Sequence, residues 1–482
     1  MYLTRLYPSP NSYTENSEEA FTFGSECRIV LPECLNDTEV KNIVDLFNRF
    51  TFTASKAKIV INGSDFTALV GDFPSDAAPA AGEYYTVHSD KRGAAVTAVN
   101  KKALIEGISM LMQLIIPHSL ESGSEEFSIT PVDLADQPSI KVRMIHLCVF
   151  PESSISTLKK AVAMSGFLGF THIILEFWGM IRYDVNPSLS WDNAFTKTEM
   201  KTLVELAHGW GMEVIPMINH LGHAAQSRVC MGRHTVLNQN PRLQMLFEPD
   251  GWTWCTTNPV TRQLLSDIRA ELMELCGDGG YFHLGFDEAY SFATCPNCRK
   301  HEPYKLLAEY INYLSDDLAK YGRRGIIWHD ELVNIADFAP EMRNTVVANG
   351  QSHNTHPAID LLDRRVIIAD WQYNYKTDDN PSTEYFIKKG FDVLCCPWDV
   401  PSNVKALCNS TRNTGAFGIM MTTWDHLPAF ISQLTRFADY MHSEKPAPFL
   451  PISETAAILR KVYPEAIQNF EESGWRRCEV DD

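Results

Sequence analysis

From Lys141 onward, short apolar segments alternate with longer segments of helical character, and this alternation limits the fold more than any other feature of the chain. Eight apolar segments have the length and composition of buried strands. They are the runs 142–149, 172–177, 213–218, 325–329, 366–371, 392–397 and 418–424, together with a run that begins at Tyr281. Eight strands separated by helices or long loops predict an α/β protein with a (β/α)₈ TIM barrel.

Helix signals lie between these strands. Helices are expected around 157–164, at 197–210 and at 304–321. Asn258 and Pro259 combine an N-cap with proline at the first helical position, which predicts a helix from there toward Gly277. A ninth apolar run, 344–349, has no place in an eight-stranded barrel, so the strand count depends on leaving it out.

The segments before and after the barrel are predicted to form separate parts. Residues 1–138 are expected to make a small α+β domain, with strands at 57–62, 84–89 and 94–99, a helix at 101–116 and an exposed loop at 119–126. The barrel is assigned to 139–440. Residues 441–482 are predicted to be a helical extension packed on the barrel, with its helix at about 452–473.

Composition and net charge limit the classes of molecule that the protein is expected to bind. The 482 residues include 45% hydrophobic and 21% charged residues, which is typical of a globular protein. A formal net charge of −18 disfavours nucleic acid and anionic membranes as partners, because both require a basic surface. No run is long enough to span a bilayer. A neutral or cationic small ligand fits this charge better.

The first residues and the cysteines bear on location. Residues 1–8 lack a charged leader followed by a long apolar core, so no signal peptide is predicted, although a signal already removed would leave the same sequence. Twelve cysteines in a chain of this kind are interpreted as reduced thiols. Together these observations predict a cytoplasmic location.

Chemistry is expected where the strands end, because the βα loops at that face of a barrel build the active site. Tryptophans there offer flat faces to a sugar ring, and the carboxylates and histidines beside them suit its hydroxyls. Any one of these tryptophans taken alone is better explained by packing. The predicted strand ends carry Glu176, Trp178, Asn219, His220, His223, Asp287, Glu288, Trp328, His329, Asp330, Glu331, Asp370, Trp371, Tyr373, Trp398, Asp399, Trp424, Asp425 and His426.

Asp287 and Glu288 stand out because they are adjacent and end an apolar strand. Successive side chains of a strand point to opposite faces, so both acids can face one pocket only if the backbone turns there. A carboxylate pair is what glycoside hydrolysis requires. The alternative is an exposed turn with two solvated acids, and His283 before it is expected to pack inside the barrel.

Several motifs in order resemble glycoside hydrolase family 20, the β-N-acetylhexosaminidases. His283-Leu284-Gly285-Phe286-Asp287-Glu288 is similar to the family's His-hydrophobic-Gly-Gly-Asp-Glu signature. Val214 to Ile218 with Leu221-Gly222-His223, and Ile326 to Asp330, resemble its third-strand and fifth-strand motifs. The spacing of the motifs and the run Cys255-Thr256-Thr257-Asn258-Pro259 look closest to the hexosaminidase D-like branch. The N-terminal unit resembles the family's accessory domain, and the likeness covers roughly residues 50–435.

The resemblance implies a retaining exo-β-N-acetylhexosaminidase that releases terminal β-linked GlcNAc or GalNAc from glycans or glycoconjugates and needs no cofactor. In this family the substrate's own 2-acetamido oxygen attacks the anomeric carbon. Glu288 would then be the general acid and base, and Asp287 would hold the acetamido N–H. Ionised Asp287 is expected to keep Glu288 protonated nearer neutral pH. The substrate-binding residues expected are Glu176, His223, Trp328, Asp330, Trp371, Tyr373, Trp398, Asp399 and Trp424, with Tyr373 on the acetamido oxygen and Trp398-Asp399 as its rival.

Three departures from the family pattern affect specificity. Phe286 replaces the second glycine of the signature and is expected to narrow the space beside the acids. The segment His146 to Pro151 lacks the arginine that many members place after the first strand. Trp424-Asp425-His426 stands where Trp-x-Glu is usual. Altered hydroxyl contacts imply either tolerance of the galacto configuration or another substrate.

Cys295-Pro296-Asn297-Cys298 has the spacing of half a zinc site. A structural zinc would need two more ligands, for which Cys255, Cys230 and His301 are candidates, and the alternative is a pair of reduced thiols in a loop.

Two other functions remain open at this point. One is a barrel that binds sugar without turnover, which the missing arginine and the altered Trp-x-Glu favour. The other is a metal-dependent hydrolase using His220, His223, Asp287 and His329. The motifs predict neither the oligomeric state nor the aglycone.

Overall fold

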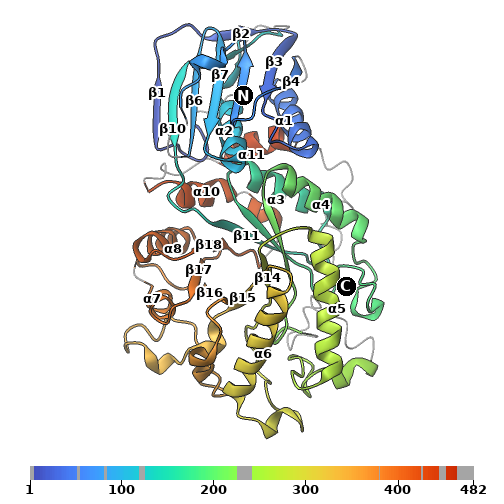
Figure 1. Cartoon of the computed structure of the whole chain (residues 1–482). Coiled ribbons are helices and arrows are strands. Elements are labelled where there is room, and N and C mark those ends of the chain that lie inside the picture. Colours follow the sequence, from blue (N-terminus) through green and yellow to red (C-terminus); the bar gives the residue numbers. More distant parts are fainter. Residues whose placement is uncertain are drawn as a thin grey trace, which may run out of the picture.

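The computed structural model of the chain describes residues 5–51, 55–80, 84–118, 125–224, 241–378, 380–424, 427–431, 433–444 and 452–463. Figure 1 shows two parts, an N-terminal sheet domain at the top and a barrel below it, with α10 (Leu434–His442) and α11 (Ile452–Val462) near their junction. No helix in the described ranges is long and apolar enough to cross a membrane.

The N-terminal domain is built on a seven-stranded sheet with the order β1-β10-β6-β7-β5-β3-β4. α2 packs against β6 and β7, and α1 packs against β4 and against α4 of the barrel. A small second sheet has the order β2-β9-β8. The bounds are β1 Ser12–Glu15, β2 Phe21–Phe23, β3 Glu26–Leu31, α1 Asp37–Phe50, β4 Lys56–Ile61, β5 Thr67–Gly71, β6 Tyr85–Asp90, β7 Gly93–Ala98, α2 Lys101–Gln113, β8 Ile115–Pro117, β9 Phe127–Ile129 and β10 Val132–Asp136.

The three strands predicted for this domain are present as β4, β6 and β7. The predicted helix is too long at its end, since α2 stops at Gln113 and Ile115–Pro117 forms β8. Pairing of β8 with β9 explains the difference, because hydrogen bonds to another strand outweigh the local helical pattern. Most of the loop expected at 119–126 lies outside the described residues.

The eight predicted barrel strands are confirmed, and all neighbours are parallel. They form one closed barrel, in which β18 pairs with β11. The strands are β11 Arg143–Cys148, β12 His172–Glu176, β13 Glu213–Met217, β14 Tyr281–His283, β15 Arg324–Trp328, β16 Ile367–Trp371, β17 Asp392–Cys396 and β18 Gly418–Met421. The ninth apolar run, 344–349, is not a strand, and the connection there contains the 3₁₀ helix His356–Leu361 packed on α6.

The helices around the barrel begin and end where their caps require. Asn258 accepts a hydrogen bond from the Val260 N–H, Pro259 is the first helical residue, and Gly277 ends α5 with φ 77°. This confirms the helix predicted from Asn258 to Gly277. The barrel helices are α3 Ile155–Phe167, α4 Lys197–Gly209, α5 Pro259–Cys276, α6 Pro303–Ala319, α7 Pro381–Lys388, α8 Pro401–Thr414 and α9 Leu427–Ile431.

Buried polar contacts join the two parts. The Arg143 guanidinium donates to the Glu106 carboxylate at 2.8 Å, and both side chains are buried. His442 Nε2 lies 2.6 Å from Asp136 Oδ2. α11 contacts α1 of the N-terminal domain as well as α3 of the barrel. The last strand of the N-terminal sheet ends at Asp136, and the first barrel strand begins at Arg143.

Candidate active site

The acid pair lies on a turn that follows β14. Gly285, Phe286 and Glu288 have φ values of 74°, 87° and 47°, which lie in a region that residues other than glycine rarely adopt. These left-handed residues break the alternation of an extended strand. As a result the side chains of Asp287 and Glu288 both reach the same histidine, which adjacent residues of an extended strand could not do.

Two glycines let this turn lie against the loop that follows β13. A Cβ added at Gly285 would come within 1.8 Å of Asn219 Oδ1, and one added at Gly222 would come within 2.0 Å of the Asp287 carbonyl oxygen. The backbones are therefore too close for any larger residue. This contact brings His223 next to the acids.

Phe286 does not narrow the space beside the acids. Its side chain is 1% exposed and packs against Tyr310 of α6, with ring centroids 5.8 Å apart. The turn directs the Phe286 ring into the layer between the barrel and α6.

His223 bridges the two carboxylates. Its Nε2 lies 3.1 Å from Glu288 Oε2 and 3.3 Å from Asp287 Oδ2. Burial by itself would lower the pKa of His223, but the carboxylates of Asp287 and Glu288 raise it to about 10. His223 is therefore a cation between two acids at neutral pH.

The two acids have opposite pKa shifts. Burial raises the pKa of Asp287 against the opposing effect of His223, and the charge of Glu288 adds to the increase. Burial would also raise the pKa of Glu288, but hydrogen bonds and charge from His223, with a hydrogen bond from Tyr290, lower it. The expectation that Glu288 would be the acid with the raised pKa was wrong, because it considered only the charge of Asp287 and not the hydrogen bond and charge from His223.

Two further acids, from the segment after β15, accept hydrogen bonds from the backbone of residues 288 and 289. We call residues 285–288 the catalytic turn. Asp330 Oδ2 accepts hydrogen bonds from the Glu288 N–H at 2.9 Å and from the Asn349 amide at 2.7 Å. Glu331 Oε1 accepts from the Ala289 N–H at 3.0 Å. Burial, reinforced by neighbouring acids, raises the pKa of Asp330 to about 6 and that of Glu331 to about 8. Both oxygens of Asp330 accept from the protein, because Trp371 Nε1 also donates to Oδ1.

Two residues at the site were not identified from the sequence. Trp252 donates from Nε1 to the Glu288 carbonyl oxygen at 2.6 Å, and its ring lies 4.4 Å from that of His223. Tyr290 stacks on Trp252 at 6.1 Å and hydrogen-bonds Glu288. Tyr290 directly follows the acid pair and its neighbour, so proximity in sequence could have identified it. Trp252 lies in a loop before α5 and carried no such signal.

Aromatic side chains from β15 to β18 form one connected group. Trp371, Tyr373 and Trp398 are in ring contact, with centroids 5.2 and 5.4 Å apart. Trp424 donates from Nε1 to the Tyr373 hydroxyl at 2.5 Å and packs against Trp328. Trp328 is only 1% exposed and belongs to the apolar cluster that fills the barrel interior, on which Trp371 and Trp424 pack.

Glu176 lies at the end of β12 and is fully buried. It accepts from Asn219 Nδ2 at 2.9 Å and lies 2.9 Å from His146 Nε2. Asp399 is partly exposed in the loop after β17, whereas Asp425 and His426 lie outside the described residues. Where the family often has an arginine, Cys148 and Phe150 instead form an apolar cluster with Trp178 and Trp424.

The four residues of the metal-hydrolase hypothesis do not converge. His220 is fully buried, with Nδ1 2.7 Å from the Ile218 carbonyl and Nε2 3.0 Å from Arg269. His329 Nε2 lies 2.9 Å from the Val347 carbonyl. Within the described ranges, two groups of ligand atoms lie close enough for a metal, and neither is this set. They are His146, Cys148 and Glu176, already held by mutual hydrogen bonds, and Glu248, Cys255, Cys295 and Cys298.

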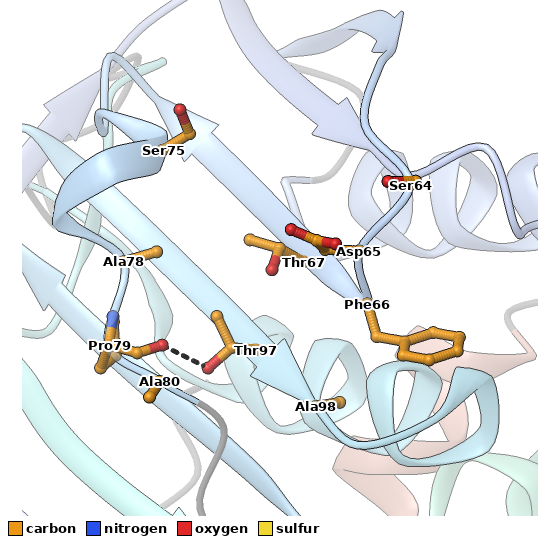
Figure 2. Close-up of a pocket in the computed structure, with 10 residues that line it drawn as sticks. All are labelled: Ser64, Asp65, Phe66, Thr67, Ser75, Ala78, Pro79, Ala80, Thr97 and Ala98. Carbon is orange, nitrogen blue, oxygen red and sulfur yellow. Dashed lines mark hydrogen bonds between the residues drawn. The ribbon is translucent and has the colours of Figure 1, made fainter.

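The N-terminal domain contains a pocket of about 420 Å³, shown in Figure 2. Asp65 and Thr67 line it, and Thr97 donates to the Pro79 carbonyl at its edge (Figure 2). Its ten lining residues include one carboxylate and no histidine, so it lacks the paired groups found at the barrel.

A parallel eight-stranded barrel with an adjacent Asp–Glu pair and an aromatic group at the strand ends has the architecture of a glycoside hydrolase. The model of glycosyl hydrolase family 20, catalytic domain, matches residues 174–426, just over half of the chain. The chain belongs to this family. Its members need no cofactor for catalysis.

Solved structures agree with this fold. An exo-β-N-acetylglucosaminidase from Vibrio harveyi in complex with N-acetylglucosamine superposes with a TM-score of 0.68 at 13% identity, covering 95% of this chain and 77% of that one. For the β-N-acetylhexosaminidase of Bacteroides fragilis the TM-score is 0.65 at 18% identity, with 92% of each chain covered. That of Streptomyces coelicolor A3(2) gives 0.61 at 16%, covering 98% of this chain and 97% of that one.

Proposed function

We propose that this enzyme is a retaining exo-β-N-acetylhexosaminidase that removes terminal β-linked GlcNAc or GalNAc by substrate-assisted catalysis. The observation that carries the proposal is the state of Asp287. Its Oδ2 lies 3.3 Å from His223, whereas its Oδ1 is buried and has no hydrogen-bond partner among the described residues. A buried oxygen of this kind is costly unless a donor reaches it, and the acetamido N–H of the substrate is such a donor.

The residues divide the reaction between them. Asp287 accepts the acetamido N–H and so directs the acetamido oxygen at the anomeric carbon. That oxygen forms the new bond as the glycosidic bond breaks, and Glu288 gives its proton to the departing oxygen. Asp287 then offsets the positive charge of the oxazolinium ring. Glu288, now ionised, takes a proton from the water that opens the ring, which restores both the acid and the β-configuration.

Tyr373 is the residue we assign to the acetamido oxygen. Its hydroxyl oxygen accepts from Trp424 Nε1, which fixes the position of the hydroxyl. Burial raises the pKa of Tyr373 well above its usual value, and the charge of Asp287 adds to the increase, so the hydroxyl stays protonated and can donate to the acetamido oxygen. Asp330 acts on the reaction through the Glu288 backbone that it holds.

His223 keeps Glu288 ionised in the free site, yet the reaction needs a protonated acid. We propose that the aglycone covers Glu288, whose side chain is 30% exposed, and raises its pKa by removing water from it. We also propose that the enzyme accepts both GlcNAc and GalNAc, which differ in configuration at one hydroxyl. The apolar cluster of Cys148, Phe150 and Trp178 supports this, because it stands where an arginine would otherwise contact the sugar hydroxyls.

Aryl glycosides test the function. The enzyme is expected to hydrolyse 4-nitrophenyl β-GlcNAc and β-GalNAc, with kcat/KM values within about one order of magnitude of each other. It should leave the β-glucoside intact, because that sugar has no acetamido group, and a thiazoline analogue of the oxazoline should inhibit it. Equal cleavage of the β-glucoside, or no cleavage of either N-acetyl sugar, would contradict the proposal.

The role of Glu288 is tested by Glu288→Gln, which should lower kcat/KM by about 10²–10⁴-fold because the general acid is lost. Glu274→Gln is the control, since Glu274 is an exposed carboxylate on α5. Unchanged activity in Glu288→Gln would exclude it as the acid.

A cytoplasmic location is also proposed. It is supported by the cysteines, since none of the ten in the described part of the chain is in a disulfide. Fractionation of the producing cells tests it, and recovery of the enzyme outside the cytoplasm would contradict it.

A further inference from the structure

A buried cluster of three thiols and one carboxylate lies beside the catalytic turn. Glu248 and Cys255 belong to the loop before α5, whereas Cys295 and Cys298 belong to the loop that follows the acid pair. The four side chains are at most 8% exposed, and their possible ligand atoms all lie within 4.8 Å of one another. Cys255 is one of the partners predicted for the cysteine pair. Glu248 was not predicted, Cys230 lies outside the described residues, and His301 is exposed and not in the cluster.

The sulfur positions suit a shared ion better than a disulfide. Cys255 Sγ is 3.6 Å from Cys295 Sγ and 3.6 Å from Cys298 Sγ. Two sulfurs bound to tetrahedral zinc at about 2.3 Å are about 3.8 Å apart. A disulfide would join only two of the three sulfurs, at about 2.0 Å. One sulfur equally distant from two others is compatible with three ligands around a common centre.

Glu248 supplies the fourth ligand. Its Oε2 accepts hydrogen bonds from the backbone N–H groups of Cys295 at 2.5 Å and Thr294 at 3.1 Å, which orient the carboxylate. Among the described residues its Oε1 is buried and makes no conventional hydrogen bond, and the Cys298 side chain contacts the same carboxylate. A fully buried carboxylate oxygen left in this state destabilises the fold, and a cation bound to it would remove that cost.

Hydrogen-bond donors surround the sulfurs. The Cys298 N–H donates to Cys295 Sγ at 3.3 Å, across the two residues that separate the cysteines. Thr257 Oγ1 lies 3.2 Å from Cys298 Sγ, where its hydroxyl can donate to a thiolate. Hydrogen bonds from neighbouring groups to the ligands are typical of protein metal sites, where they orient the ligands and offset their charge.

We propose that Glu248, Cys255, Cys295 and Cys298 bind one zinc ion in a closed tetrahedral site. Each thiol releases its proton to solvent as its sulfur–zinc bond forms, and no oxidation occurs. Four protein ligands leave no position for water or substrate, so the ion is structural rather than catalytic.

The ion would join the two loops that hold the acid pair. Trp252 lies between Glu248 and Cys255 in sequence and donates to the Glu288 carbonyl. Ser291 lies between Glu288 and Cys295 in sequence, and its Oγ donates at 2.6 Å to Asp250 in the loop before α5. Zinc thereby fixes the position of Glu288 through Trp252.

Metal analysis tests the site without any assay of hydrolysis, so its outcome is independent of the proposed function. The full chain, purified under reducing conditions without chelator, should contain one zinc ion per chain when measured by inductively coupled plasma mass spectrometry. A mercurial reagent that blocks thiols should release this zinc, and cobalt in its place should give the visible absorption of a tetrahedral thiolate site. Wild-type protein that stays zinc-free after incubation with zinc would overturn the proposal, as would a native disulfide among the three cysteines.

Variants locate the ion. Cys298→Ser and Glu248→Gln are expected to lose most of the zinc, whereas Cys276→Ser should keep it, since Cys276 is a buried thiol outside the cluster. Removing zinc from the wild type should lower its Tm and leave the Tm of Cys298→Ser unchanged. Full zinc content in both Cys298→Ser and Glu248→Gln would overturn the assignment. If Cys298→Ser fails to fold, release of zinc from the wild type by the mercurial reagent still decides whether thiols hold it.

Discussion

At the scale of single residues, the active site depends on a cation, His223, whose contacts with the two acids the motifs did not predict. His223 lies between Asp287 and Glu288 and sets opposite pKa shifts on the two acids. A sequence shows that two carboxylates are adjacent, but it does not show how far a histidine 64 residues earlier lies from either of them. The distances of 3.1 and 3.3 Å decide the charge state of the site.

The raised pKa of His223 predicts a dependence of stability on pH. An unfolded imidazole titrates near about 6.5, and His223 in the folded chain titrates at about 10. A group whose pKa is raised on folding stabilises fully below its unfolded pKa, and this contribution is lost as pH rises through its folded pKa. The difference in the free energy of unfolding between wild type and His223→Gln should therefore decrease between about pH 6.5 and about pH 10.

Urea denaturation at several pH values measures this difference. His208→Gln serves as the control, because burial lowers the pKa of His208 and its contribution should not change above about pH 6.5. A His223→Gln difference that grows with pH would contradict the raised pKa.

At the scale of elements, the turn after β14 carries an unusual residue. Phe286 has φ 87°, a conformation that glycine adopts without strain and that costs other residues about 1–2 kcal/mol. Packing of its ring against Tyr310 offsets part of that cost.

Two substitutions separate backbone strain from packing. Phe286→Gly and Phe286→Ala both remove the ring, so they differ only at Cβ. The glycine variant is expected to be more stable by about 1 kcal/mol, the reverse of the usual order. At Lys405, an exposed position in α8, alanine should be the more stable by about 0.5–1 kcal/mol. Chemical denaturation measures both pairs, and the same order at both sites would mean that Phe286 is not strained.

At the scale of the whole molecule, the N-terminal domain is joined to the barrel through charge as well as through packing. Glu106 on α2 pairs with Arg143 at the start of β11, and Lys102 lies 3.5 Å from the same carboxylate. The Glu106 and Arg143 side chains are each 4% exposed, so neither charge can be screened by water.

Glu106→Gln should therefore destabilise the chain. It leaves a buried guanidinium without its counter-charge, which costs about 3 kcal/mol or more. Asp45→Asn, which breaks the exposed Lys41–Asp45 pair, should change the free energy of unfolding by less than about 0.5 kcal/mol. Thermal and urea unfolding test both variants, and equal effects would show that the buried pair does not hold the domains together.

The sequence by itself determined the barrel, because burial on both faces of a parallel strand leaves a continuous apolar run that can be recognised locally. It also determined the position of the acid pair and the caps of α5. It missed helix α1, despite the capping box at Asn36, and it missed β1, β2, β3, β5, β8, β9 and β10 and the end of α2. The short strands were missed because pairing in a mixed sheet depends on partners distant in the chain.

Only the tertiary structure decided how the site residues are used. It placed Trp252 on Glu288, turned Phe286 toward α6, assigned Asp330 to the backbone of the catalytic turn and brought Glu248 to the three cysteines. The physical reason is the same in each case. Hydrogen bonds, charge and ligand geometry depend on distances of a few ångströms between loops, and those distances exist only after the barrel has closed.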